Sequence, residues 1–254
     1  MLSDATSTAV AAARRLLLTG AWDLALALLE GVDTAEGADG TEGADGAGGA
    51  GGDGVAALRA QILVERHWWR LDDPAAALAA VGALPEGSPQ ASFLRAQLAY
   101  TWLLFGVEAG AAAGAGAGAE EGTAEAGFRA AAEGPATAGW GTFWLGVLRQ
   151  NIADDDAAAR PYFDESLRLC RAEGDPLLES YVVRHLSGYE PDPVPLLRRS
   201  LHLRAALGAR PQLAAAQMSL WQELPEGPEG DLLREAALST ARELGLTWML
   251  KFLA

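Results

Sequence analysis

Two stretches of the chain repeat one another at a fixed distance, and this spacing restricts the fold more than any other feature of the sequence. Residues 165–169 (ESLRL) return as residues 199–203 (RSLHL), 34 positions later. The glycines that follow them, Gly174 and Gly208, have the same separation, and a third, weaker copy ends at Gly245. Glycine favours the left-handed conformation that closes a helix. The sequence therefore predicts a helical unit that recurs about every 34 residues.

The same period continues upstream once two low-complexity tracts are set aside. Small residues are expected where the two helices of a unit approach closely, and four alanines mark these positions: Ala25, Ala77, Ala126 and Ala159. The spacing between them is too long where residues 33–54, acidic and rich in glycine, and residues 109–119, only alanine and glycine, intervene. Neither tract has a large apolar side chain to offset the entropy of ordering it. We predict one helical repeat domain over residues 1–254, with flexible insertions at these two tracts.

Helices are expected along the rest of the chain. Alanine is abundant and β-branched residues are few, which favours closely packed helices over sheets. Hydrophobic periodicity predicts helices at residues 6–18, 21–31, 55–71, 73–83, 90–107, 122–133, 138–152, 155–173, 175–188, 192–207, 210–223, 230–244 and 246–253. A single pair cannot bury its apolar face alone, so neighbouring pairs must stack to form a continuous core.

This pattern resembles the tetratricopeptide repeat (TPR) family, whose unit is an antiparallel pair of helices. The resemblance covers residues 6–30 and 55–245, about six units, and rests on the recurring glycines and small residues described above. Residues 196–208 (LLRRSLHLRAALG) also resemble helical repeats attached to actinobacterial regulatory ATPases, although no nucleotide-binding module accompanies them. The resemblance implies an all-α fold, an α-solenoid that forms a right-handed superhelix of helix-turn-helix pairs.

Net charge and cysteine content restrict the compartments and partners expected for the protein. The net charge is −15, which repels nucleic-acid phosphates and anionic membranes, and no basic run exceeds a pair of arginines. The uncharged, mainly apolar stretch at residues 96–107 has 12 residues, whereas a membrane-spanning helix needs about 20. The single Cys170 suits a reducing compartment. We therefore expect a cytoplasmic protein without nucleic-acid or membrane partners.

No motif indicates a catalytic or metal site. Residues 154–156 (DDD) precede an alanine-rich helix and are expected to cap it rather than bind a metal. The three histidines lack the spacing of zinc ligands. The glycine-rich residues 46–54 lack the Gly-Lys-Ser/Thr ending of a phosphate-binding loop. We expect no metal, no cofactor and no enzymatic activity.

In the TPR family, ligands lie in a concave groove lined by the first helix of each pair. The resemblance, applied by repeat phase, places the following residues on that groove: Arg14, Arg59, Arg66, Trp69, Trp140, Trp144 and His185. Three arginines on an acidic protein suit an acidic peptide or protein partner. The adjacent Trp68 and Trp69 point about 100° apart, so both cannot face the core.

Two functions fit this surface. The first is an adaptor or scaffold that holds a peptide or protein in a broad groove. The second is a sensor that encloses a small molecule or signal peptide in a pocket. The apolar residues 246–253 are predicted to dock as a terminal helix. We expect the protein to be a monomer, or a weak dimer formed through that helix.

Overall fold

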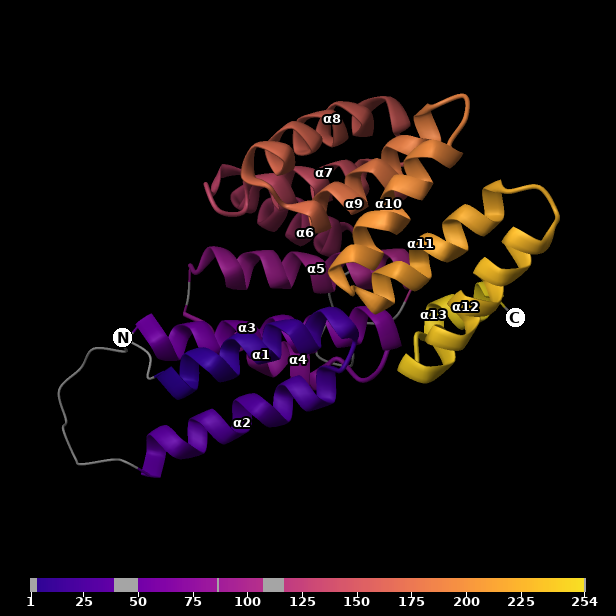
Figure 1. The fold of residues 1–254 in the computed structure, drawn as a ribbon. Helices are drawn as coiled ribbons and strands as arrows, with labels where there is room; N and C mark the ends of the chain where they lie inside the picture. Colours follow the sequence, from indigo (N-terminus) through magenta and orange to yellow (C-terminus); the bar gives the residue numbers. More distant parts are fainter. Residues whose placement is uncertain (1–3, 39–49, 86, 107–116, 254) are drawn as a thin grey trace.

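The computed structural model describes residues 4–38, 50–85, 87–106 and 117–253, and within these ranges the protein is all-helical, with no strand. Thirteen α-helices follow one another in the described ranges (Figure 1). They are α1 (Asp4–Thr19), α2 (Trp22–Ala38), α3 (Ala50–Arg70), α4 (Ala75–Gly82), α5 (Pro89–Phe105), α6 (Ala117–Glu133), α7 (Ala138–Asn151), α8 (Asp156–Glu173), α9 (Pro176–Leu186), α10 (Val194–Leu207), α11 (Arg210–Glu223), α12 (Pro228–Leu244) and α13 (Thr247–Leu253), with a short 3-10 turn, η1 (Ser187–Tyr189), after α9.

Each predicted helix is present, and the differences lie at the low-complexity tracts. Helix α2 continues to Ala38, α3 begins at Ala50, and α6 begins at Ala117. The edges of both predicted insertions are therefore helical, because a formed helix extends readily through alanine. The remaining parts of the two tracts, residues 39–49 and 109–116, lie outside the described residues.

The helices pack in consecutive antiparallel pairs. Helix α1 contacts α2, α3 contacts α4, and the same holds for α5 with α6, α7 with α8, α9 with α10 and α11 with α12. The glycines predicted to close helices do so, since Gly174, Gly208 and Gly245 follow α8, α10 and α12 at φ of 70°, 68° and 71°. Asp155 caps α8 by accepting a hydrogen bond from the amide of Ala158, which agrees with the capping role predicted for the aspartate run.

Three of the four small residues expected at close approaches are buried: Ala25, Ala77 and Ala159. Ala126 is exposed, so its prediction is wrong by one position. The neighbouring Gly127 is buried against α5, where a β-carbon would lie 2.5 Å from the carbonyl oxygen of Ser92. Helix α6 approaches α5 so closely that only glycine fits there.

A similar close approach between α6 and α7 gives a prediction about stability. A β-carbon at Gly141 would overlap the backbone nitrogen of Ala132 and lie 2.6 Å from the carbonyl carbon of Ala131. Because backbone cannot move aside as a side chain can, we expect Gly141→Ala to lower the free energy of unfolding by about 2 kcal/mol. Urea denaturation followed by circular dichroism measures this. Gly122→Ala is the matched control.

Gly122 lies on an exposed part of α6, with no atom within 4 Å of an added β-carbon. Alanine has the higher helix propensity, so the control should gain about 0.5–1 kcal/mol. Equal effects of the two substitutions would contradict the close packing of α6 on α7.

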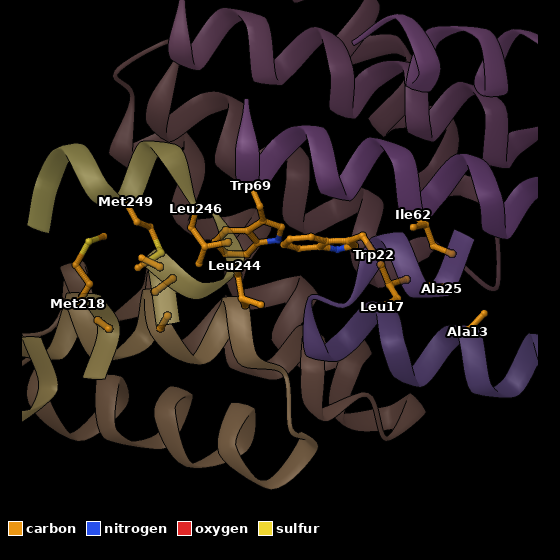
Figure 2. Packing of buried hydrophobic residues seen from close by; sticks show 14 of the residues in the cluster. Ala13, Leu17, Trp22, Ala25, Ile62, Trp69, Met218, Leu244, Leu246 and Met249 are labelled. Atoms are coloured by element: carbon orange, nitrogen blue, oxygen red, sulfur yellow. The ribbon is translucent and has the colours of Figure 1, made fainter. Parts of the chain in front are cut away.

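The N-terminal and C-terminal helices share one apolar core. This cluster combines Leu17, Trp22 and Ile62 from the first three helices with Leu244 and Met249 from the last two. Helix α1 contacts α11, and α3 contacts α13. Figure 2 shows these side chains lying together, although the two groups are about 180 to 230 positions apart in the sequence. The succession of helix pairs therefore turns back on itself, and its two ends meet.

Helix α13 joins the two ends. Its residues Met249 and Leu253, and the preceding Leu246, are fully buried in this core. Trp248 stacks on Trp69 of α3, with ring centroids 5.7 Å apart. Residues 246–253 therefore dock as predicted, but against α3 as well as their neighbour α12. Since these side chains face inward, a weak dimer through α13 would have to use the exposed Phe252 instead.

Candidate functional site

A cavity of about 360 Å³ lies among the first helices of the six pairs. Its wall includes residues of α1, α3, α5, α7, α9 and α11, together with the loop before α7. It falls within the size range of small-molecule sites, roughly 300–1,000 Å³. Because α1 and α11 meet, the surface that would be an open groove in an extended array here surrounds an enclosed space. The exposed Arg14 belongs to the wall, so the cavity reaches solvent there.

Aromatic rings make up much of the wall. They are Trp68, Trp69, Phe93, Trp140, Trp144 and Tyr181. Several hold one another in place through edge contacts: the ring centroids of Trp68 and Trp144 are 6.0 Å apart, and those of Trp140 and Tyr181 are 5.4 Å apart. Trp144 also stacks on Phe128 behind it. A wall of rings fixed in this way provides large, rigid contact surfaces for a ligand.

The polar groups of the wall are mainly neutral, with one carboxylate. Four glutamines (Gln61, Gln90, Gln97 and Gln212) and two threonines (Thr101 and Thr137) surround Glu65. The Gln212 amide donates a hydrogen bond of 2.9 Å to the Glu65 carboxylate. Burial raises the pKa of this carboxyl to about 7, although Gln212 and the indole of Trp69 oppose the shift. Glu65 therefore exchanges its proton close to neutral pH.

Two buried polar atoms of the wall residues have no hydrogen-bond partner within the described part of the chain. They are Nε1 of Trp144 and Oε1 of Gln212. Both side chains are at least nine-tenths buried. Buried polar groups are normally paired, and an unpaired one carries a cost of about 1–3 kcal/mol. Such donors and acceptors in the wall of a cavity are available to a polar ligand after small shifts of the rings.

A buried arginine supports the α9 side of the cavity. Arg204 of α10 donates to Ser180 Oγ at 3.1 Å and to the carbonyl oxygen of Gln212 at 2.7 Å. Its guanidinium lies 4.6 Å from the centre of the Tyr181 ring. Burial lowers the pKa of Arg204 to about 9 and raises that of Tyr181 to about 12. Arg204 therefore fixes Tyr181 and Gln212, two wall residues, relative to each other.

The residues predicted for the groove divide into two groups. Four line the cavity: Arg14, Trp69, Trp140 and Trp144. Arg59, Arg66 and His185 are not among its lining residues. On α3 the cavity is faced by positions 61, 64, 65, 68 and 69, which form one helical face, so the predicted phase of this helix is shifted by about one residue. Both Trp68 and Trp69 line the cavity.

Arg66 and His185 have other structural roles. Arg66 pairs with Asp23 Oδ1 of α2 at 3.0 Å and with Asp72 at 3.1 Å. His185 packs on Phe163 with ring centroids 5.0 Å apart, and its Nδ1 lies 2.7 Å from Gln150 Oε1. Burial and the nearby charges of Arg184 and Arg204 hold the pKa of His185 well below its usual value. It is therefore neutral at physiological pH.

Sequence reasoning missed Glu65, Gln212 and Tyr181. A signal for Glu65 exists, because residues 61–69 (QILVERHWW) place one carboxylate on a helical face whose other members are Gln61 and the apolar or aromatic Val64, Trp68 and Trp69. No such signal exists for Gln212 and Tyr181. They approach Glu65 only because the chain closes, and sequence periodicity describes each helix separately.

The described residues contain no group of three or more His, Cys, Asp or Glu side chains placed to hold a metal ion. Nor does any helix within the described ranges combine the length and apolar character required to cross a membrane. Comparisons of the chain with family models, with curated proteins and with solved structures found no match.

Proposed function

We propose that this protein is a receptor, which binds a small molecule or a short signal peptide in the cavity between its first helices. One observation carries the proposal: a single cavity has wall residues on α1, α3, α5, α7, α9 and α11. A ligand there contacts the N-terminal and C-terminal helices at the same time. Its binding energy therefore favours the closed arrangement over any opened one, and this gives the protein a way to report occupancy.

An adaptor that holds a protein partner in a concave groove is the competing proposal. Arg14, which lines the mouth of the cavity, supports it. However, Arg66 is held by Asp23 and Asp72, and the enclosed volume of about 360 Å³ suits a small ligand better than a folded domain. We therefore favour the receptor.

We further propose that the helix pairs are degenerate TPR units in a right-handed superhelix, which is closed by α13. The 34-residue spacing of the helix-ending glycines Gly174 and Gly208 supports this assignment. We also propose a binding role without catalysis, in the cytoplasm. In support, burial raises the pKa of the Cys170 thiol to about 11, which disfavours the reactive thiolate form.

A cavity-filling substitution tests the receptor. Gln97 of α5 lines the cavity, whereas Arg95 on the same helix is exposed and does not. We expect ligand-observed NMR with a library of small fragments to find binders whose affinity falls at least about tenfold in Gln97→Trp. The same fragments should bind Arg95→Trp as they bind the unaltered protein.

Circular dichroism and thermal unfolding check that both variants remain folded. A library without binders, or binders that Gln97→Trp does not affect, would remove the cavity from the functional account. The adaptor would then be the better proposal.

A further inference from the structure

Glu65 is a carboxylate without a basic partner. Its hydrogen bond comes from the neutral amide of Gln212, and no arginine, lysine or histidine forms an ion pair with it among the described residues. Two arginines of the surrounding helices have other partners: Arg204 donates to Ser180 and to the Gln212 carbonyl, and Arg70 pairs with Asp23. Glu65 is half-buried, and a carboxylate withdrawn from water is normally paired, because desolvation favours its neutral form. Here the place of the partner is the cavity itself.

The rings around Glu65 suit a cation as well. Trp69 follows Glu65 by one helical turn and Trp68 lies beside it. Trp140 and Trp144 line the same cavity from α7, with Trp144 in edge contact with Trp68. The face of an indole attracts a positive charge, most strongly where water is excluded. A carboxylate and several indoles around one enclosed space form the combination that binds alkylammonium groups.

From this geometry we infer that the ligand is a small organic cation, an apolar body that bears one protonated amine or quaternary ammonium group, with the charge on Glu65 and the body against the tryptophans. This inference rests on the proposed function, since it names the chemical class bound by the same cavity. Other donors of the wall, such as the amides of Gln61 and Gln97, are available to polar substituents on the ligand.

Other charged and titratable groups surround the cavity. Arg14 on α1 lies at its mouth. On α9, burial raises the pKa of Tyr181 to about 12, lowers the pKa of Arg184 and holds the pKa of His185 well below its usual value. Arg204 on α10 remains protonated below its pKa of about 9. Affinity for a cation should therefore follow the ionisation of Glu65.

Three probes of similar size separate the possible ligand charges: 2-phenylethylamine (a cation), 2-phenylethanol (neutral) and phenylacetate (an anion). Titration calorimetry near pH 8 should give the amine at least about tenfold tighter binding than the alcohol, which is the effect of about 1.4 kcal/mol expected for a desolvated cation. Near pH 6, where a group of pKa about 7 is mostly protonated, the preference should fall by about tenfold. Phenylacetate should bind most weakly.

The variant Glu65→Gln isolates the carboxylate, because it keeps the size of the side chain and its ability to accept a hydrogen bond from Gln212. We expect it to bind the alcohol within about twofold of the unaltered protein and to lose both the preference for the amine and its pH dependence. A preference that survives in Glu65→Gln would overturn the inference. So would an alcohol or phenylacetate that binds as tightly as the amine.

Failure of this inference differs from failure of the proposed function. If the probes bind without regard to charge and Gln97→Trp displaces all of them, the cavity is a ligand site of another class. If no probe binds and the fragment library also finds no ligand, neither proposal stands.

Discussion

Replacing Met249 by alanine should lower the free energy of unfolding by about 3 kcal/mol, because this side chain fills the core that joins the two ends of the fold. Met249 is fully buried between α13 and the N-terminal helices, next to Leu246 and Leu253. Phe252 lies on the same helix and is 64% exposed, so Phe252→Ala removes a larger side chain at almost no cost in packing. The two substitutions therefore measure burial in α13 rather than its helix propensity.

Removing residues 246–254 should have a still larger effect. The deletion exposes to solvent the ring of Trp69, which stacks on Trp248, and part of the Leu244 side chain. We expect the melting temperature to fall by about 10 °C or more, with binding of a dye specific for apolar surface and self-association on a sizing column. A shortened protein that stays monomeric and melts like the full chain would show that α13 adds nothing to the core. Equal effects of Met249→Ala and Phe252→Ala would contradict its packing.

The helices could be predicted from the sequence because each is specified locally. Periodic apolar positions mark α8, α10 and α12, and Gly174, Gly208 and Gly245 end them. The residue at which two helices approach most closely was harder to predict. Ala126 and Gly127 are both small and adjacent, and only the contact of α6 with Ser92 selects Gly127.

The site was predictable only in part, for a physical reason. Arg14, Trp69, Trp140 and Trp144, which the resemblance assigns to a groove, lie on helices that surround the cavity, and a role in binding stays a prediction. The closure that turns a groove into a cavity depends on contacts such as α1 with α11, between helices about two hundred positions apart. The local pattern of either helix contains no information about that contact. The ion pair of Arg66 on α3 with Asp23 on α2 also joins two different helix pairs, and the sequence pattern of either helix does not indicate it.

The burial of Glu65 should make the stability of the protein depend on pH in the direction opposite to that of most carboxylates. Its pKa is about 7 in the folded protein, compared with 4.5 for an exposed glutamate. Below about pH 4.5 the group is protonated in both states and has no effect. As the pH rises to about 7, the unfolded chain loses this proton while the folded protein keeps it, so the unfolded state is favoured. Above that range the penalty is constant, up to about 3 kcal/mol.

Glu65→Gln should therefore stabilise the protein near pH 8 by up to about 3 kcal/mol and have little effect near pH 4.5. Urea denaturation of both proteins across this range measures the difference, in which the titration of all other groups cancels. Stability curves that stay parallel would show that Glu65 ionises as an exposed group does and has no unusual environment. A variant that gains stability at pH 8 and loses affinity for 2-phenylethylamine would connect the two effects. Glu65 would then be a carboxylate that weakens the empty protein because its partner is the ligand.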